Sequence, residues 1–301
     1  MRILVCGASG QVGHELIRRG TLRGLQVTGL SHAELDITDE SGVSQAVRQL
    51  RPELIVNAAA FTQVDAAESR PEIVYAVNRD GVRYLARAAR EHAVPVLHMS
   101  TDYVFSGDSA TPYRESDPTS PTGVYGSSKL AGEQVLQEEL EQALILRTSW
   151  VFGAHGRNFV KTMLRLGTER DVLSVVDDQV GCPTFAGGLA EVLLELASRY
   201  AASGNLRWGL YHYSGSPTCS WFGFANEIFR QAAATGLLAR VPDVKPIATA
   251  QYPTPARRPA WSVLDSSLFQ ETFGITARDW RDDLAEVIGD LSNRPTCERR
   301  A

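Results

Sequence analysis

The sequence Arg2-Ile-Leu-Val-Cys6-Gly7-Ala-Ser-Gly10-Gln-Val-Gly13 decides the fold of this chain. The apolar run Ile-Leu-Val is typical of a short buried strand, and the glycines follow at once with the spacing G-x-x-G-x-x-G. Residues 11–19 then have the pattern of an amphipathic helix. Glycines so placed permit a tight turn, a close approach of the backbone to a pyrophosphate, and close packing of helix on strand. The helix start offers amide donors and a positive dipole end to phosphate. The stretch therefore predicts a βα unit that binds a dinucleotide.

Strand-like and helix-like stretches alternate up to residue 150. We expect strands at residues 2–6, 26–30, 53–59, 95–99 and 143–147, and helices at residues 11–19, 40–50, 71–93 and 130–140. Such alternation predicts a parallel sheet with right-handed crossovers. Beyond Trp150 the pattern loosens into shorter elements and loops. The predicted fold class is α/β: a doubly wound parallel sheet (Rossmann) over residues 1–150, to which later segments return, a smaller α+β substrate lobe over residues 151–292, and a polar tail over residues 293–301.

The charge balance and the cysteines narrow the class of protein. The chain of 301 residues has a formal net charge of −5 at pH 7, so it has no basic surplus to neutralise a nucleic acid. It starts directly with a strand and has no apolar run that could cross a bilayer, so we expect neither a signal peptide nor a membrane partner. The cysteines at positions 6, 182, 219 and 297 form no C-x-x-C pair, which disfavours a zinc site or a disulfide framework. We therefore expect a cytoplasmic protein with reduced thiols.

Tyr125 and Lys129 form the second informative pattern. They flank Gly126-Ser-Ser128 beside a strongly helical run, and their spacing puts both side chains on one face of a helix. A lysine ammonium near a phenol favours the phenolate and lowers the pKa of the tyrosine. Such a pair can exchange a proton near neutral pH, as carbonyl reduction or alcohol oxidation requires. The pattern alone also fits a half-buried tyrosine beside a solvated lysine, so the rest of the chain has to decide.

Other candidate residues stand near the carboxyl ends of the expected strands. Doubly wound sheets bind ligands beyond these ends, so Ser100 or Thr101 is expected to face the same crevice as Tyr125. Small residues at positions 58–60 leave room for a ligand, although they also ease packing. Asn78 fits a satisfied core asparagine as well as a binding residue. Two neighbouring arginines, 257 and 258, suit a diphosphate, whereas the first alone fits a solvated loop charge.

The end of the second strand bears on the choice of coenzyme. Ser31 stands where an NAD enzyme often has Asp or Glu to hold the ribose hydroxyls. A carboxylate there would repel a 2′-phosphate, so Ser31 predicts that both coenzymes work, NADPH at least as well as NADH. Asp36 and Ile37 either border the adenine or simply precede Thr38 or Asp39 as the cap of the next helix.

Together these motifs resemble those of the dTDP-4-dehydrorhamnose reductases, within the extended short-chain dehydrogenase/reductase superfamily. The resemblance covers nearly the whole chain. It is carried by Gly7-x-x-Gly10-x-x-Gly13, Asn57-Ala-Ala-Ala60, Ser100-Thr-Asp-Tyr-Val-Phe105, Tyr125-Gly-x-x-Lys129, Arg147-Thr-Ser-Trp-Val-Phe152, Asn158-Phe159, Asp178-Gln-x-Gly-x-Pro-Thr184 and Arg258-Pro259 followed by Ser262.

The resemblance implies an enzyme that reduces the 4-keto group of dTDP-4-dehydro-6-deoxy-L-mannose to dTDP-L-rhamnose with NADPH or NADH. It implies that Tyr125 gives a proton to the forming alkoxide, that Lys129 binds the nicotinamide ribose and tunes Tyr125, and that Thr101 hydrogen-bonds the substrate oxygen. The coenzyme-binding residues that it implies are Gly7, Ser9, Gly10, Gln11, Val12, Gly13, Asp36, Ile37, Ala58, Ala59, Ala60, Tyr125 and Lys129. The implied substrate-binding residues are Thr101, Asp102, Tyr103, Trp150, Asn158, Gln179, Thr184 and Arg258, with Trp150 packed on the sugar.

The resemblance leaves a metal, the oligomer and some functions open. Some members of the family are dimers bridged by Mg²⁺ on carboxylates. Glu15 and Glu191 match positions of that kind, but Gly187 stands where another carboxylate is expected, so no metal is predicted and a homodimer stays open. Alternative functions are another dTDP-4-keto-deoxysugar reductase, an epimerase that recycles its hydride, and a non-catalytic regulatory subunit that binds NADP and a partner enzyme.

Overall fold

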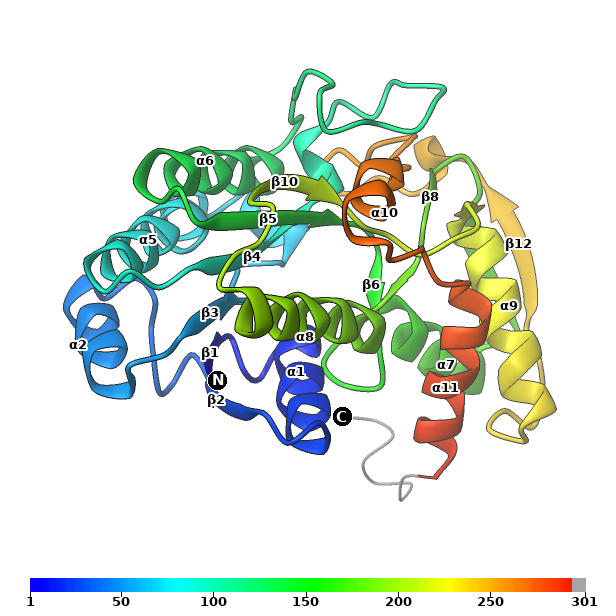
Figure 1. The fold of residues 1–301 in the computed structure, drawn as a ribbon. Helices are drawn as coiled ribbons and strands as arrows, with labels where there is room; N and C mark the ends of the chain where they lie inside the picture. The colour runs from blue at the N-terminus through cyan, green and yellow to red at the C-terminus, as the bar shows by residue number, and fades with distance from the viewer. Residues whose placement is uncertain (294–301) are drawn as a thin grey trace.

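Six parallel strands form the central sheet of the computed structural model, which describes residues 1–293. Their order is β10-β5-β4-β3-β1-β2 (Figure 1). The strands are β1 (Arg2–Cys6), β2 (Gln26–Leu30), β3 (Leu54–Asn57), β4 (Val96–Thr101), β5 (Ala143–Thr148) and β10 (Gly209–His212). This arrangement confirms the predicted doubly wound α/β sheet. The order reverses between β1 and β3, and ligands bind at such a reversal, beyond the carboxyl ends of the strands.

The strands of the sheet are apolar on both faces, and helices cover each face. In β1, Ile3 and Val5 pack with the helices α1 and α8, whereas Leu4 and Cys6 pack with α2, α5 and α6 on the opposite face. Figure 1 shows these two helical layers. The helices of the two layers are α1 (Gln11–Leu22), α2 (Glu40–Leu50), α5 (Gly81–Glu91), α6 (Val124–Glu139) and α8 (Ala186–Ser203).

The glycine stretch lies where the strand order reverses, because β1 is paired with both β2 and β3. Gly7 has a φ of 81°, and a Cβ there would lie 2.7 Å from the backbone N of Ala59. A Cβ on Gly13 would lie 2.2 Å from the carbonyl oxygen of Gly7. The turn thus brings the start of α1 against the end of β3, and side chains at either glycine would force them apart.

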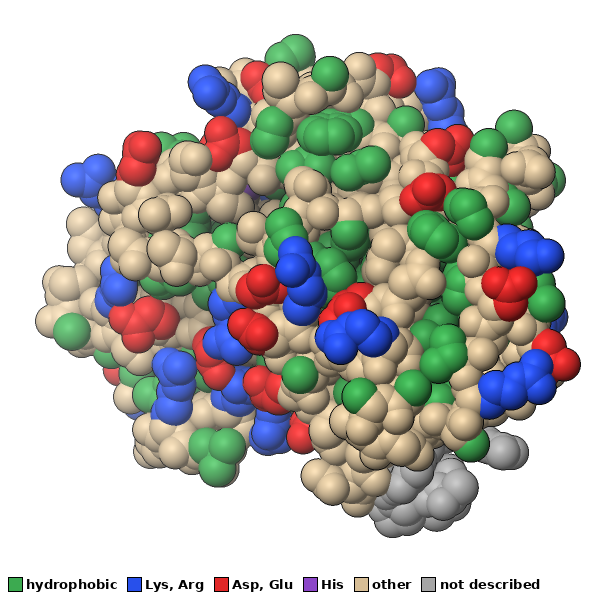
Figure 2. All heavy atoms as spheres, turned by 90° about the vertical axis from the view of Figure 1, so that its right-hand side faces the viewer, with side chains coloured by type: hydrophobic (Ala, Val, Ile, Leu, Met, Phe, Trp, Pro, Cys, Tyr) green, Lys and Arg blue, Asp and Glu red, His purple; other side chains and the backbone are tan. Residues whose placement is uncertain are grey.

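Segments from the second half of the chain divide between this sheet and a smaller lobe. Strand β10 extends the sheet at β5, and α8 packs on α1. The helices and short strands of the smaller lobe lie on the right-hand side of Figure 1. They enclose an apolar core of their own. Figure 2 shows the outer face of this side of the molecule, where charged side chains of both signs lie next to one another. The remaining elements are α3 (Val64–Ala67), α4 (Pro71–Tyr75), β6 (Val151–Phe152), α7 (Phe159–Glu169), β7 (Val172–Val176), β8 (Val180–Gly181), β9 (Thr184–Phe185), β11 (Cys219–Ser220), α9 (Trp221–Ala234), β12 (Asp243–Ile247), α10 (Ser267–Phe273) and α11 (Trp280–Ser292).

The helical stretch predicted over residues 71–93 is continuous over residues 71–91, but it contains a π-helical turn that was not predicted. Helix α4 passes into a π-helical turn, Ala76–Asp80, before α5 begins. Asn78 lies in this turn and bonds the backbone N–H and C=O of Phe61 and the hydroxyl of Ser128. Asn78 is therefore a satisfied core asparagine. The extra residue of the π-helical turn orients the Asn78 side chain toward both Phe61 and Ser128.

Two further expectations concern local features. Asp39 is the N-cap of α2 and accepts a hydrogen bond from the backbone N–H of Ser41, which confirms the capping alternative. Among residues 1–293, no helix has both the length and the apolar character that a membrane crossing requires. All but the first residue of the expected polar tail lies outside the described residues.

Candidate active site

The end of β4 presents Thr101 and Asp102 to the crevice. Successive side chains of a strand point to opposite faces, and Ser100 accordingly turns away and donates to Glu133. The Thr101 hydroxyl donates to Asp102 Oδ1 over 2.9 Å and accepts the backbone N–H of Tyr103. Asp102 is 2% exposed, and its Oδ2 has no hydrogen-bond partner among the described residues. Burial raises the pKa of Asp102 to about 7, and the hydrogen bond from Thr101 opposes this effect.

Tyr125 lies in the first turn of α6, next to this strand end. A Cβ on Gly126 would lie 2.1 Å from the carbonyl oxygen of Tyr103, so the glycine lets the helix approach the loop after β4. The rings of Tyr103 and Tyr125 meet edge to face at 5.5 Å. Burial raises the pKa of Tyr125, and the nearby Thr101 side chain opposes this effect only in part. The expected lowering of this pKa by Lys129 is not seen, because burial dominates and Lys129 is not among the groups that act on Tyr125.

Lys129 is buried one turn further along α6. Its Nζ donates to the carbonyl oxygen of Met99 over 2.7 Å and lies 3.4 Å from His98 Nε2. Burial lowers the pKa of Lys129 to about 8, and the charge of Glu133 acts in the opposite direction. The interpretation as a solvated surface lysine is thus wrong.

The residues expected to bind the coenzyme surround the reversal of strand order. The amide of Ala59 donates to Asn57 Oδ1, and Gln11 at the start of α1 reaches the backbone of Val151. These residues, with the glycine turn, could hold a dinucleotide: a Cβ at Gly10 meets only the Gly7 carbonyl oxygen, at 3.2 Å, so its outer side is open.

A carboxylate lies against the residue that follows β2. Glu34 Oε2 accepts hydrogen bonds from both the backbone N–H and the hydroxyl of Ser31, over 2.8 and 2.7 Å. Glu34 folds back onto Ser31 through the turn that follows the strand, so a carboxylate lies beside the position where an NAD enzyme often has Asp or Glu. Asp36 likewise bonds the backbone and hydroxyl of Thr38.

Several predicted substrate residues gather beyond the same sheet edge. Arg258 donates to the hydroxyl of Tyr103 over 2.9 Å and pairs with Asp65 over 2.7 Å. Trp150, held at a φ of 47°, stacks on Trp221 with ring centroids 3.5 Å apart.

Other predicted substrate residues have most of their hydrogen bonds inside the protein. Asn158 is the N-cap of α7 and also donates to Gln11 Oε1. Thr184 accepts the backbone N–H of Gly215, and Gln179 donates to Thr249. A structural role accounts for their contacts, and their binding roles stay predictions.

The residues that match metal positions in the family do not fit a metal here. Arg19 donates to Glu15 over 2.9 Å and also pairs with Glu191 and Glu286. A Cβ on Gly187 would lie 2.4 Å from Arg19 Nη2, so the glycine makes room for the guanidinium. The cation between these carboxylates is therefore an arginine.

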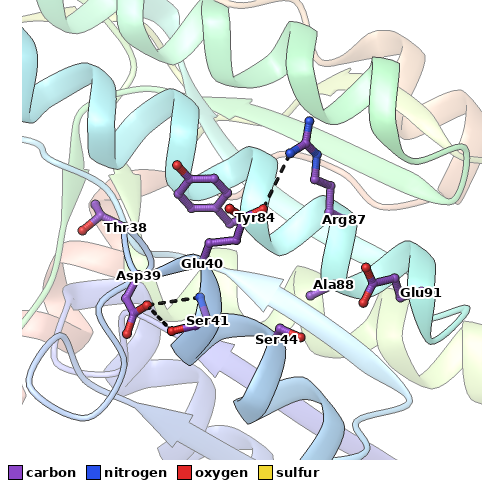
Figure 3. A pocket seen from close by; sticks show the side chains of 9 residues that line it. All are labelled: Thr38, Asp39, Glu40, Ser41, Ser44, Tyr84, Arg87, Ala88 and Glu91. Atoms are coloured by element: carbon purple, nitrogen blue, oxygen red, sulfur yellow. Dashed lines mark hydrogen bonds and ion pairs between the residues drawn. The ribbon is translucent and has the colours of Figure 1, made fainter.

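A separate surface pocket of about 480 Å³ lies between α2 and α5 (Figure 3). It contains none of the predicted catalytic residues. Acidic side chains predominate over its single arginine, so it does not favour an anionic ligand. Its lining residues are Thr38, Asp39, Glu40, Ser41, Ser44, Tyr84, Arg87, Ala88 and Glu91.

Comparison with known proteins agrees with this geometry. The family model described as the RmlD substrate binding domain matches residues 1–293. The chain belongs to this RmlD family. A dTDP-4-dehydrorhamnose reductase of Aggregatibacter actinomycetemcomitans is 45% identical to it, over 95% of this chain and 98% of the relative.

Two solved structures of dTDP-4-dehydrorhamnose reductases have the same fold as this chain. A dTDP-4-dehydrorhamnose reductase from Clostridium acetobutylicum superposes with a TM-score of 0.90 at 37% identity, over 97% of this chain and 100% of that one. The enzyme from Bacillus anthracis, solved in complex with NADP, gives 0.89 at 35% identity, over 96% and 99%. The resemblance seen in the sequence is confirmed.

One residue of the site, His98, was not foreseen from the sequence. A histidine in the apolar strand β4 was a visible signal, because a polar side chain at a buried strand position needs a partner. Glu34 lies three positions after Ser31 in the sequence, and only the folded turn brings its carboxylate onto that residue.

Proposed function

We propose that this protein reduces the 4-keto group of dTDP-4-dehydro-6-deoxy-L-mannose to dTDP-L-rhamnose with NADPH or NADH, the last step of dTDP-rhamnose biosynthesis. The observation that carries the proposal is the meeting of Thr101, Tyr125 and Lys129 at the carboxyl end of β4, beside the glycine turn after β1. Relatives named for this activity align with nearly the whole chain and support the assignment.

Each catalytic side chain has a role that its surroundings suit. When bound, the coenzyme supplies the hydride. Tyr125 holds its proton firmly because burial raises its pKa, so it is protonated and ready to donate to the forming alkoxide at neutral pH. Thr101 donates to Asp102 and lies near Tyr125, and it can orient the substrate carbonyl. Trp150, Tyr103 and Arg258 would contact the sugar and the diphosphate.

The direct test is an assay of the purified protein with dTDP-4-keto sugars and either reduced coenzyme. We expect stoichiometric oxidation of coenzyme and formation of dTDP-L-rhamnose, identified by mass spectrometry and NMR. Turnover of another dTDP-4-keto-deoxysugar alone would favour the alternative reductase. A product formed without net coenzyme consumption would indicate an epimerase. Coenzyme binding without turnover of any sugar would favour a regulatory subunit.

Location and assembly belong to the same proposal. A cytoplasmic location is supported by the buried free thiols of Cys6 and Cys182, which suit a reducing compartment. A homodimer is the assembly that the family suggests, and sedimentation of the purified protein would test it.

A further inference from the structure

A buried chain of hydrogen bonds leads from the coenzyme side of the site to Lys129. His98 in β4 is 0% exposed; its Nδ1 lies 3.1 Å from Asn57 Nδ2 and its Nε2 lies 3.4 Å from Lys129 Nζ. Asn57, at the end of β3, is 1% exposed and accepts the backbone N–H of Ala59 at its Oδ1 over 3.1 Å. The chain therefore runs Ala59, Asn57, His98, Lys129.

The first bond fixes the direction of the others. The backbone N–H of Ala59 is always a donor, so it holds the Asn57 amide with its oxygen toward Ala59 and its NH₂ group toward His98. His98 Nδ1 must then be the acceptor. A neutral imidazole has one N–H and one lone pair, so its proton sits on Nε2, the nitrogen that faces Lys129.

This direction conflicts with a charged lysine. An ammonium has three N–H donors and no lone pair, so it would face the N–H of His98 donor to donor. A neutral amine has a lone pair for His98 Nε2–H and still donates to the Met99 carbonyl oxygen at 2.7 Å. The neutral form completes the chain.

A second buried histidine shows the opposite arrangement. His212 Nδ1 lies 3.0 Å from the carbonyl oxygen of Tyr113, which can only accept, so this nitrogen carries the proton. The other nitrogen, Nε2, is then the acceptor and lies 3.4 Å from Arg147 Nη1. A permanent cation thus meets a lone pair at His212, whereas Lys129 meets an N–H at His98.

The other groups around Lys129 leave this arrangement intact. Glu133, on α6, favours the charged lysine, but its carboxylate is engaged by both arms of Arg147, over 2.9 and 2.6 Å, and by Ser100. Tyr125, on the same helix, is protonated. Burial and the Lys129 charge hold the pKa of His98 well below its ordinary value, so His98 is neutral, and Lys129 titrates near pH 8.

We propose that His98 is a positioning residue that sets the charge of Lys129: the amine completes the chain, and protonation requires His98 to move its proton from Nε2 to Nδ1 and Asn57 to turn away from Ala59. Resting on the proposed function, the same switch links coenzyme binding to proton uptake. Bound coenzyme brings negative charge into the crevice, and a nearby negative charge favours the lysine ammonium.

The test begins with the protein free of coenzyme, so it does not depend on the proposed function. Selective ¹⁵N labelling of histidine and lysine reports the His98 tautomer and the charge of Lys129 through a pH titration. The lysines of the chain are Lys129, Lys161 and Lys245, and the change Lys129→Met assigns the signal. We expect His98 to be an Nε2–H tautomer at high pH and to change tautomer at the midpoint of Lys129, while His212 stays Nδ1–H throughout. A His98 tautomer that does not change across the Lys129 titration would overturn the proposal.

A variant and a binding measurement complete the test. Asn57→Ala frees His98 to choose its tautomer without adding charge, so the Lys129 midpoint should rise by about one pH unit or more; an unchanged midpoint would contradict the proposal. Calorimetry in buffers of different ionisation enthalpy should show proton uptake on NADPH binding above pH 8 in the wild type, and less in Asn57→Ala. Binding without proton uptake would remove the link to the coenzyme, and no binding at all would count against the proposed function instead.

Discussion

Gly187 makes room for the guanidinium of Arg19, since a Cβ there would lie 2.4 Å from Nη2. The Arg19 group also lies over the ring of Phe185, at 5.4 Å from its centroid. Burial acts to raise the pKa of Glu15, but hydrogen bonds from Arg18 and Arg19 outweigh it, so this pKa lies below its ordinary value. The glycine and the arginine therefore act as one unit that neutralises a carboxylate cluster.

Removal of this cation should destabilise the protein and create a site for a metal ion. Arg19→Met leaves the carboxylates of Glu15, Glu191 and Glu286 close together, and we expect the free energy of unfolding to fall by about 1–3 kcal/mol. Because carboxylate oxygens bind Mg²⁺, millimolar Mg²⁺ should restore part of the loss. Thermal unfolding with EDTA or Mg²⁺ would measure both effects, with the exposed Arg48→Met as the control. Equal responses of variant and wild type to Mg²⁺ would contradict this expectation.

The change Tyr125→Phe should abolish turnover while coenzyme still binds. Phenylalanine keeps the buried ring but removes the proton donor, and general acid catalysis contributes roughly 10²–10⁴-fold. Steady-state kcat and a fluorescence titration with NADPH separate the two effects. Tyr84→Phe, in the surface pocket of Figure 3, serves as the matched control and should keep wild-type kcat. A Tyr125→Phe enzyme with more than about a third of wild-type kcat would remove Tyr125 from the mechanism.

The choice between coenzymes should depend on Glu34. Its carboxylate sits on Ser31 at the end of β2, where a 2′-phosphate would lie near it. Glu34→Gln removes the negative charge and keeps an acceptor for Ser31, so kcat/KM should rise several-fold for NADPH and change little for NADH. Glu72→Gln, on the exposed start of α4, is a suitable control. An unchanged ratio of the two kcat/KM values would show that this carboxylate has no part in the choice.

Ionisation of the buried Asp102 should lower the free energy of unfolding as the pH rises. Its pKa is about 7 in the folded protein against about 3.9 when unfolded, so the folded state holds the extra proton between these values. Stability therefore falls from about pH 4 to pH 7, by about 2–4 kcal/mol from this group.

Comparison with an uncharged side chain isolates this contribution. In Asp102→Asn this fall in the free energy of unfolding with pH should be absent. Between pH 4 and pH 8 the stability of the variant relative to the wild type should therefore rise by the same amount. Urea unfolding at a series of pH values measures this difference, with the exposed Asp108→Asn as the control. A stability difference that does not change with pH would contradict the buried acid.

Features set by local sequence could be predicted, because a strand or turn leaves its own periodicity. The apolar run of β1 and the glycines after it form a pattern about a dozen residues long. This local pattern correctly predicted the strand, the turn and the start of α1. The π-helical turn at Asn78 was not predicted because its cause lies in tertiary contacts. The Asn78 side chain forms hydrogen bonds with both Phe61 and Ser128, which are distant in sequence.

Features set by distant partners could not be predicted from one sequence. The charge environment of Tyr125 depends on how deeply α6 is buried, and the spacing to Lys129 does not reveal that depth. Gly187 was noted only as a missing carboxylate. The space beside it is filled by the Phe185 ring and by Arg19, and the contact with an arginine 168 positions earlier becomes visible only when α1 and α8 are packed together.

The late arrival of β10 has a consequence for synthesis on the ribosome. The outer edge of β5 stays unpaired, and the apolar face of the sheet stays uncovered by α8, until residues 186–212 have emerged. At about 5–20 residues per second, the nascent chain would carry that open edge for several seconds after β5 is made. An unpaired strand edge recruits other strands, so this interval is when the chain most needs a chaperone.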